Sequence, residues 1–329
     1  MNSIGFEMLL SEIASVKPVH SVGRVIEVSR GVLTVSGLSE IAALGDLVEI
    51  GHGTQIRRGE ILQLDKTSVT VLPDGGPDGL SIGDPVAHIG KNHISPDDMW
   101  IGRVIDPFGQ PLDGKPILQG NKPRALRGKP MNPTERRALG KRLETGLAVF
   151  NTLLPIVRGQ RIGLFAGSGV GKSTLLAKLA TGLEADVVVI AMVGERGREV
   201  REFIDRVLGP AGMKRSVIVA ATSDQSPMVR RRCAWTAMSV AEHFRDKGKQ
   251  VLFLADSVTR FAESHREVAL ATGESSSLRG FPPSTSHLIT SLCERAGPGI
   301  GDAGDITAVF SVLVAGSDME EPIADILRG

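Results

Sequence analysis

The sequence contains no tyrosine, and aromatic residues of all kinds make up only 4% of its 329 residues. Proteins that bind single-stranded nucleic acid without sequence preference stack bases on aromatic side chains, so this composition argues against that class. The formal net charge of +1 gives no global attraction for nucleic acid or for an anionic membrane. We therefore expect no nucleic acid among the partners of the chain.

Cysteine is also scarce. Cys233 and Cys293 are the only two, and their separation matches neither a metal-binding nor a redox spacing, so we interpret them as free thiols in a reducing compartment. Long apolar runs are absent as well, since the strongest one, 187–193, is too short to span a bilayer. The N-terminus lacks the basic start and apolar stretch of a signal peptide, and we expect a cytoplasmic protein.

The length favours two domains, because single hydrophobic cores rarely grow to 329 residues. Residues 21–95 contain short apolar segments separated by turn residues at regular spacing, a pattern typical of a small β-barrel. Strands are expected at Val22–Val28, Val32–Val35, Leu47–Ile50, Ile61–Leu64, Val69–Leu72 and Val86–Ile89. Residues 1–20 precede the barrel as an N-terminal arm, in which the spacing of Phe6, Leu9, Leu10 and Ile13 predicts a short helix with one apolar stripe.

Residues 96–145 are interpreted as a linker, or crossover, between the domains. A strand is expected at Gly102–Ile105, and the residues after it are rich in proline, glycine and basic side chains. Between positions 115 and 142 the basic residues face a single acid, Glu135. An RNA or lipid surface is one reading of this charge, and a solvated linker is the other. We favour the linker, because no aromatic residue is interleaved for base stacking.

Residues 146–329 show apolar runs alternating with helical segments, which predicts an α/β domain with a parallel sheet covered on both faces. Strands are expected at Arg161–Phe165, Asp186–Met192, Ser216–Ala221, Val251–Ala255 and Ile306–Val314. Helices are expected near Lys172–Thr181, Arg198–Leu208, Pro227–Lys247, Val258–Ala271 and Ser284–Arg295.

A glycine-rich segment between the first of these strands and its helix has the context that a phosphate-binding loop requires. It reads Ala166, Gly167, Ser168, Gly169, Val170, Gly171, Lys172, Ser173 and Thr174. Alanine replaces the first glycine of the strict pattern, a mild departure because Gly169 and Gly171 still let the backbone approach phosphates. Its amides should cradle the β-phosphate of ATP, Lys172 should neutralise phosphate oxygens, and Ser173 should ligate Mg²⁺.

Two acidic residues complete the predicted catalytic site. Asp256 ends an apolar strand, in the form of a Walker B segment, and would hold Mg²⁺ beside the loop. Glu195 follows the second strand, at the edge where parallel sheets form ligand crevices, and is our candidate for polarising the attacking water. Arg196 is the candidate for orienting Glu195. Spacing alone equally allows Glu195 to be paired with Arg196 or Arg198 on a solvated turn.

Several segments occur in an order that resembles the flagellar protein-export ATPases of the type III secretion family, which are relatives of rotary ATP synthase catalytic subunits. They are Gly102–Asp106, Pro111–Gly114, Gly159–Arg161, the phosphate-binding loop, Gly194–Val200, Asp256–Ala262 and Gly280–Ser284. The resemblance implies a P-loop NTPase fold of the RecA-like type behind the barrel. It also implies that Glu195 is the general base, that Lys172 and Ser173 serve phosphate and Mg²⁺, and that Asp256 is the Walker B acid.

The resemblance further implies a biological setting for the chain. It implies ATP with Mg²⁺, a homohexamer in the full-length form, and export of unfolded flagellar proteins. The implied partners are an export regulator, a stalk, chaperones and an export gate, with peripheral association at the inner membrane. Alternatives are a virulence-type III secretion ATPase, a rotary ATP synthase subunit, a hexameric RNA translocase and a non-catalytic nucleotide-binding ring subunit. Glu195 argues against the last of these.

The sequence departs from the family pattern at two places. Asn151 stands where the family usually has aspartate, which affects a local hydrogen bond or ion pair near the domain junction. The chain ends at Gly329, ahead of the segments that would supply the rest of the nucleotide domain, an arginine finger and a helical C-terminal domain. We therefore interpret the sequence as a fragment or a truncated gene product.

Overall fold

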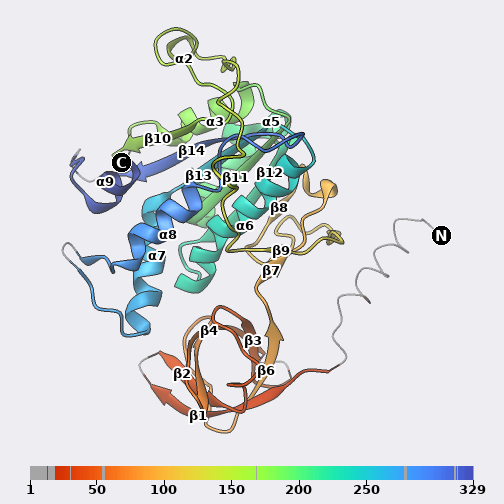
Figure 1. The fold of residues 1–329 in the computed structure, drawn as a ribbon, viewed down its shortest axis with the longest axis vertical. Coiled ribbons are helices and arrows are strands. Elements are labelled where there is room, and N and C mark those ends of the chain that lie inside the picture. The colour runs from red at the N-terminus through yellow and green to blue at the C-terminus, as the bar shows by residue number, and fades with distance from the viewer. Residues whose placement is uncertain are drawn as a thin grey trace.

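Six antiparallel strands close into a barrel at the N-terminal end of the chain, at the bottom of Figure 1. In order around the barrel they are β1 (Val22–Ser29), β2 (Val32–Ser36), β5 (Ser68–Pro73), β4 (Arg57–Leu64), β3 (Leu47–Ile50) and β6 (Pro85–Gly90). Alternate residues of β2 and β5 are buried, as expected where one face of a strand meets a core. The prediction of a small barrel is confirmed.

The structure is a computed structural model that describes residues 13, 19–29, 31–53, 56–167, 169–277, 280–314, 316 and 318–328. The predicted N-terminal arm lies outside the described residues except for Ile13, Val19 and His20. Ser168 of the phosphate-binding loop also lies outside them. Among the described residues, no helix is both long enough and apolar enough to cross a membrane.

Six parallel strands form the sheet of the larger domain. Across the sheet they are β10 (Arg161–Ala166), β14 (Ile306–Leu313), β13 (Val251–Asp256), β11 (Val187–Glu195), β12 (Ser216–Thr222) and β8 (Val104–Ile105). Every residue of β11 and β13 is buried, because helices cover both faces of these central strands. The apolar runs in the sequence are these strands, and the predicted α/β fold class is confirmed.

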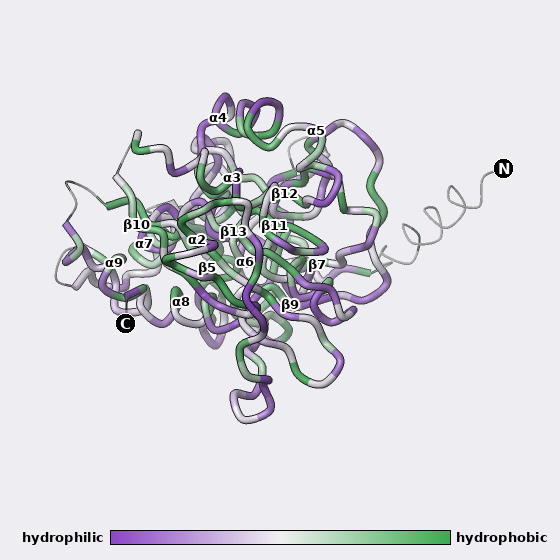
Figure 2. Tube along the Cα trace, turned by 90° about the horizontal axis from the view of Figure 1, so that it is seen from above, coloured by the Kyte–Doolittle hydropathy of each residue, from purple (hydrophilic) through white to green (hydrophobic). Residues whose placement is uncertain are grey.

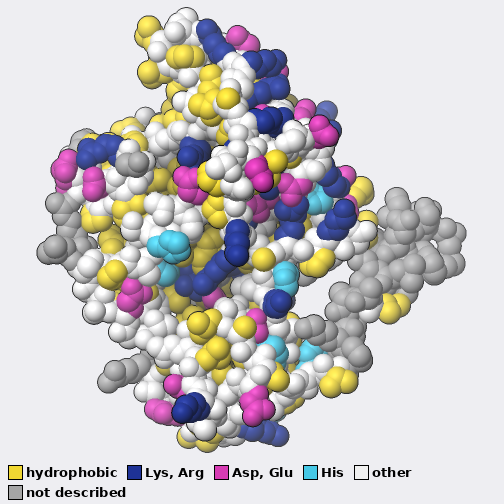
Figure 3. All heavy atoms as spheres, viewed as in Figure 1, with side chains coloured by type: hydrophobic (Ala, Val, Ile, Leu, Met, Phe, Trp, Pro, Cys, Tyr) yellow, Lys and Arg dark blue, Asp and Glu magenta, His cyan; other side chains and the backbone are white. Residues whose placement is uncertain are grey.

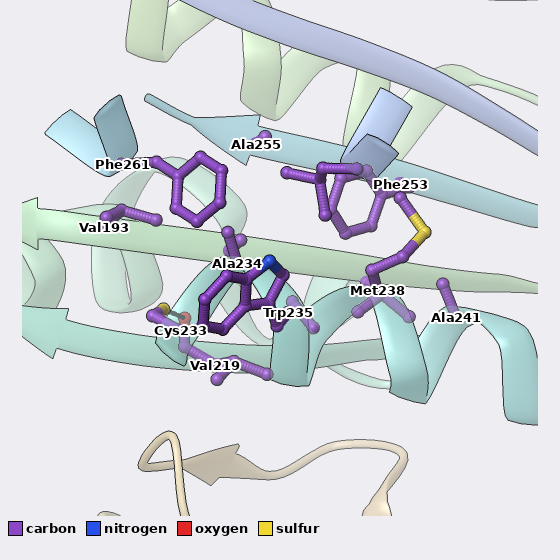
Figure 4. Packing of buried hydrophobic residues seen from close by; sticks show 14 of the residues in the cluster. Val193, Val219, Cys233, Ala234, Trp235, Met238, Ala241, Phe253, Ala255 and Phe261 are labelled. Atoms are coloured by element: carbon purple, nitrogen blue, oxygen red, sulfur yellow. Dashed lines mark hydrogen bonds between the residues drawn. The ribbon is translucent and has the colours of Figure 1, made fainter. Parts of the chain in front are cut away.

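The helices lie in two layers on either side of the sheet (Figures 1 and 2). One layer contains α6 (Pro227–Asp246), α7 (Val258–Ala271), α8 (Ser284–Cys293) and α9 (Pro322–Arg328), and it shares one buried apolar cluster with the strands. The other contains α3 (Lys172–Gly182), α4 (Gly197–Glu202), the π-helical turn η2 (Phe203–Leu208) and α5 (Gly209–Met213), with a second cluster. In the first layer, the rings of Trp235 and Phe261 meet edge to face at 5.7 Å (Figure 4).

The short elements were not predicted, because segments of two to seven residues carry no readable periodicity. They are the strands β7 (His93–Ile94) and β9 (Arg124–Ala125), the 3-10 turn η1 (Asp98–Trp100), and the helices α2 (Ala148–Thr152), α5 and α9. The predicted helix Arg198–Leu208 is divided between α4 and η2. Asn151 in α2 accepts from Thr145 Oγ1 at 2.7 Å and donates to Glu144 at 2.7 Å, a donation that the carboxylate of an aspartate could not make.

The segment 96–145 is fastened to both domains. Its strand β8 joins the edge of the parallel sheet beside β12, and its strand β9 pairs antiparallel with β7, which precedes the segment. Its basic side chains pair with acids of the two domains, at Arg124–Asp246, Arg127–Glu60, Arg136–Glu294, Arg137–Asp305 and Lys141–Glu184. Most of these basic residues are exposed to solvent, as our reading of a linker expects, and several also pair with acids that lie far away in the sequence.

A buried ion pair joins the barrel to the larger domain. Arg231 of α6 places Nη2 2.9 Å from both carboxylate oxygens of Glu60 on β4, and each side chain is 3% exposed. Arg127 donates to the same carboxylate at 3.2 Å. Because a buried charge is costly without a partner, these three groups fix how the barrel sits on α6.

Candidate nucleotide-binding and catalytic site

The phosphate-binding loop lies between the end of β10 at Ala166 and the start of α3 at Lys172. Gly169 and Gly171 have φ angles of 76° and 90°, in the left-handed region that side chains disfavour. Gly171 is also the residue that caps the N-terminus of α3. The local sequence therefore turns the backbone sharply and leaves the first amides of α3 free to bind an anion.

A cavity of about 350 Å³ opens above this loop. It is lined by Gly167, Gly169, Gly171, Lys172, Ser173, Thr174, Glu195, Arg196, Glu199, Arg260 and Leu313. The structure thus brings the predicted loop and the predicted base to one cavity, although they lie on different strands. Val170 is 68% exposed, and Ala166 forms the last rung of β10 against Leu313 of β14.

Lys172 and Asp256 form the ionic centre of the site. Lys172 Nζ lies 2.5 Å from Asp256 Oδ1, and the side chains are 10% and 7% exposed. Ser311 on β14 donates to the same carboxylate oxygen at 2.9 Å. The register of the parallel sheet explains this meeting, because β13 and β14 are adjacent and their carboxyl ends point to the loop.

Glu195 is the last residue of β11, so this strand runs three residues beyond the predicted end at Met192. The residue is only 8% exposed. Arg260 on α7 places Nε 3.3 Å from Glu195 Oε1, and its Nη1 donates to the carbonyl of Gly194. A carboxyl group beside a phosphate-binding cavity and held by a cation is placed to act on a water molecule there.

The pKa of Glu195 is raised to about 7 from an ordinary value of 4.5, chiefly by burial. The charge of Asp256 and a hydrogen bond with Glu199 also contribute to this rise, whereas the positive charges of Arg260 and Lys172 reduce it. The same hydrogen bond lowers the pKa of Glu199. A general base works best when its pKa lies near the operating pH, so the environment of Glu195 suits proton transfer at neutral pH.

Arg196 does not take the place that we expected for it. Its side chain is 72% exposed and pairs with Glu199 at 3.8 Å. The cation on Glu195 is Arg260, which comes from the first turn of α7, just after Asp256. The physical reason is the direction in which the two side chains point. Arg196 directly follows β11 and its side chain points to solvent, whereas the side chain of Arg260 points from α7 toward Glu195.

Sequence reasoning missed Arg260, Ser311, Thr259 and Glu199 as members of the site. Thr259 Oγ1 accepts from the amide of Leu313 at 2.9 Å and so ties α7 to the end of β14. A signal was present for Arg260, because it lies four residues after Asp256 in a helix capped by Ser257. No local signal could have identified Ser311, which meets Asp256 only through sheet pairing.

The oxygen donors of the site fit magnesium. Ser173 lines the cavity, and Asp256 contacts Lys172, which also lines it. Hydroxyl and carboxylate oxygens are the donors that Mg²⁺ prefers. The described residues contain no group of three or more His, Cys, Asp or Glu that could hold a metal alone. Magnesium at nucleotide sites takes one or two protein oxygens together with phosphate oxygens, so these two donors fit an ion that arrives with ATP.

Both domains match known protein-family models. Residues 146–329 match the ATP synthase alpha/beta family, nucleotide-binding domain, and residues 19–90 match the beta-barrel domain of the same family. The chain belongs to the ATP synthase alpha/beta family. The cavity above the loop lies within the residues that match the nucleotide-binding domain.

The chain is similar to several flagellum-specific ATP synthases. It is 46% identical to that of Rhizobium meliloti over 93% of this chain and 66% of the relative. It is 49% identical to that of Salmonella typhimurium over 69% of this chain and 50% of the relative. The chain spans slightly less than two thirds of the first relatives it matches, at 66%, 65% and 63% of their lengths.

Solved structures of the ATPase EscN resemble the whole arrangement of barrel and sheet. The assembled EscN of the enteropathogenic E. coli type III secretion system gives a TM-score of 0.84 at 36% identity, covering 93% of this chain and 73% of that one. EscN in complex with its central stalk EscO gives a TM-score of 0.83 at 37% identity.

Proposed function

We propose that this chain hydrolyses ATP in the cavity above the phosphate-binding loop, in a protein that drives export of flagellar proteins. The observation that carries the proposal is Glu195, a buried carboxyl with a pKa of about 7 that shares the cavity with Lys172. A solvated structural turn, the competing reading of the sequence, would leave this side chain exposed and with an ordinary pKa.

Each side chain has a role that follows from its place. The amides of Gly169 and Gly171 and the start of α3 bind phosphate oxygens, and Lys172 neutralises them in competition with Asp256. Glu195 accepts a proton from the attacking water, which then bonds to the terminal phosphorus as the bond to the leaving ADP oxygen breaks. Arg260 holds Glu195 and keeps part of its population ionised.

Magnesium, when bound with ATP, would neutralise charge on the phosphate oxygens, and Ser173 and Asp256 are the residues that would hold it. The contact with Lys172 orients this carboxylate before nucleotide arrives. Ser311 fixes the same oxygen from β14, so Asp256 is held from two sides.

The export task rests on the relatives. Flagellum-specific ATP synthases from several bacteria match at 40–49% identity, and the assembled EscN supports a homohexamer in the full-length form. The EscN–EscO complex supports a stalk as partner. We extend this to an export regulator, chaperones, an export gate and unfolded cargo in the cytoplasm, with peripheral association at the inner membrane and no nucleic acid.

The catalytic proposal is tested by Glu195→Gln, which keeps the shape of the side chain but cannot accept the proton. We expect phosphate release to fall by roughly 10² or more, as for the loss of a positioned base, with little change in the Kd of ATP. Glu202→Gln is the matched control, because Glu202 is an exposed glutamate on the adjacent helix α4. Near-normal turnover in Glu195→Gln would make Glu195 a structural residue.

A virulence-type secretion ATPase is the second candidate, favoured by the fold shared with EscN. The higher identity to flagellar relatives, 46% against 36%, supports the flagellar task. Replacing the chromosomal copy in the source bacterium with Glu195→Gln separates the two. Loss of secreted flagellin is the flagellar outcome. Intact filaments together with loss of another secreted protein would assign the chain to a virulence system.

A further inference from the structure

A second cavity, of about 420 Å³, opens between α6, α8 and the segment 127–130. It is lined by Arg127, Gly128, Lys129, Pro130, Trp235, His265, Ser284, His287, Leu288, Ser291, Leu292 and Arg295. In Figure 3, Lys, Arg and His side chains border a hollow over α6 and α8, with hydrophobic side chains inside it. None of these residues lines the nucleotide cavity.

The floor of this cavity is apolar and fixed. Trp235 is 3% exposed and Leu292 is 1% exposed, and Leu288, which also lines the cavity, is partly buried. The indole ring is braced from behind by Phe261 and carries the guanidinium of Arg127 on its face, 4.6 Å from the centroid. An apolar side chain placed against this floor would leave water at little cost in reorganisation.

The rim of the cavity carries positive charge that the acids of the described residues neutralise only in part. Lys129 is exposed and has no acidic partner among the described residues. The side chain of Arg127 is 56% exposed and shares Glu60 with Arg231, which already binds both oxygens of that carboxylate. Arg127 and Lys129 can therefore bind a carboxylate of another molecule without breaking an ion pair in which they are the sole partner of an acid.

The other charged groups of the cavity are committed to the protein. Arg295 is 2% exposed and donates to both oxygens of Glu242, at 2.9 and 2.7 Å. His265 lies 3.4 Å from Arg231 Nη1 through Nδ1 and 2.8 Å from Ser284 Oγ through Nε2. Ser284 in turn donates to Glu274 at 2.7 Å. Burial and the charge of Arg231 lower the pKa of His265 to about 4, so this wall is neutral and rigid at pH 7.

We propose that this cavity binds an acidic segment of a partner protein, with an apolar side chain against Trp235 and Leu292 and a carboxylate between Arg127 and Lys129. The inference is independent of the proposed hydrolysis, since the two cavities share no residue. A free inorganic anion would leave the apolar floor empty, and a purely apolar segment would leave the two cations without a partner. An acidic and apolar segment satisfies both halves of the cavity.

The test uses the full chain and the N-acetylated, C-amidated peptide Glu-Leu-Glu-Phe as probe. Binding is followed by tryptophan emission, because one of the two tryptophans lies in the cavity and the other, Trp100, is fully buried elsewhere. We expect a saturable change that disappears in Trp235→Phe. Lys129→Glu should weaken the Kd by about tenfold or more, the effect of reversing one member of a charge pair. Lys122→Glu is the matched control, exposed in the same segment but outside the cavity.

Three outcomes would overturn the proposal. One is equal binding of the uncharged peptide Gln-Leu-Gln-Phe, which would show that the cations do not select the ligand. Another is the absence of any saturable signal at millimolar peptide. The third is a doubling of mass by light scattering that Lys129→Glu abolishes, which would assign the cavity to a second copy of this chain. Circular dichroism of Lys129→Glu and Trp235→Phe confirms that the variants are folded.

Discussion

Arg260 and Glu195 meet at 3.3 Å although they lie 65 positions apart along the chain. The arginine comes from the first turn of α7 and the glutamate from the end of β11. The two parallel strands β11 and β13 are neighbours, so the elements that follow them begin side by side. One consequence is that the acidity of the Glu195 carboxyl depends on a side chain of the helix that follows β13.

Removing that cation should shift the pH dependence of hydrolysis. Arg260 lowers the pKa of Glu195, which burial holds at about 7. The rate should therefore rise with pH through about 7 in the unaltered chain, and Arg260→Met should move this rise to higher pH. Arg260→Lys keeps the charge and should move it less. The measurement is kcat/KM between pH 5.5 and 9, and a rise at the same pH in all three proteins would rule out this role for Arg260.

The same carboxyl should make stability depend on pH. The folded-state pKa of Glu195 is raised to about 7 from 4.5, so its protonated form favours folding, and that contribution is lost as pH rises from 4.5 through 7. Glu195→Gln lacks this titration. We expect the free energy of unfolding of Glu195→Gln, relative to that of the unaltered chain, to increase between pH 5 and pH 8 by on the order of 1 to 3 kcal/mol. Urea titrations at both pH values measure this.

Glu202→Gln serves as the control in those titrations, since Glu202 is an exposed glutamate that does not line the cavity. A difference between the unaltered chain and Glu195→Gln that stays constant from pH 5 to pH 8 would mean that Glu195 titrates normally in the folded protein.

Lys172→Ala should weaken the binding of ATP by roughly 10²-fold, because charge-assisted hydrogen bonds to phosphate are lost. Lys178→Ala, on the exposed side of the same helix α3, should leave the affinity unchanged. Calorimetric titration with ATP and Mg²⁺ compares the two. Equal affinities in the two variants would remove Lys172 from the phosphate site.

Glu60→Gln should destabilise the junction of barrel and larger domain, because it leaves the buried Arg231 without its counter-charge. We expect a loss of about 3 to 5 kcal/mol, the cost of breaking a buried pair by removing one partner. The double variant Glu60→Leu with Arg231→Met should recover most of that loss, since it removes both charges together.

Arg201→Ala provides the comparison for this loss. Arg201 pairs with Asp205 on the surface, where the side chains are 85% and 58% exposed, so its removal should cost no more than about 0.5 kcal/mol. Thermal unfolding of the three variants checks the order. A Glu60→Gln variant as stable as Arg201→Ala would show that the buried pair does not hold the domains together.

Elements that carry their own signal could be predicted from the sequence. The barrel strands and the central strands of the sheet were found because their apolar patterns are local, and α7 was predicted at its observed bounds of Val258–Ala271. The phosphate-binding loop was found because glycines, lysine and serine lie next to one another. These features depend on residues within one element, which a sequence displays directly.

Contacts between elements could not be predicted in the same way. The choice between Arg196 and Arg260 as partner of Glu195 depends on which side chain points inward at the end of β11, and sequence proximity favoured the wrong one. The ion pairs of the basic segment 115–142 were likewise not predicted, because their acids, such as Asp305 and Glu60, lie far away in the chain. Charge pairing across a fold is decided by packing, not by local composition.

Strand β8 belongs to the sheet of the larger domain, although it lies about 40 residues before position 146, where the sequence pattern of that domain begins. Gly102 donates its amide to Ser216 at 2.7 Å, and Ile218 donates to Arg103 at 3.0 Å, so residues ahead of position 146 cover the outer side of β12. A piece cut at residue 146 would bare that row of backbone donors and acceptors to neighbouring molecules, a template for sheet-to-sheet aggregation. Anyone who excises the nucleotide-binding domain should therefore begin the piece ahead of Trp100.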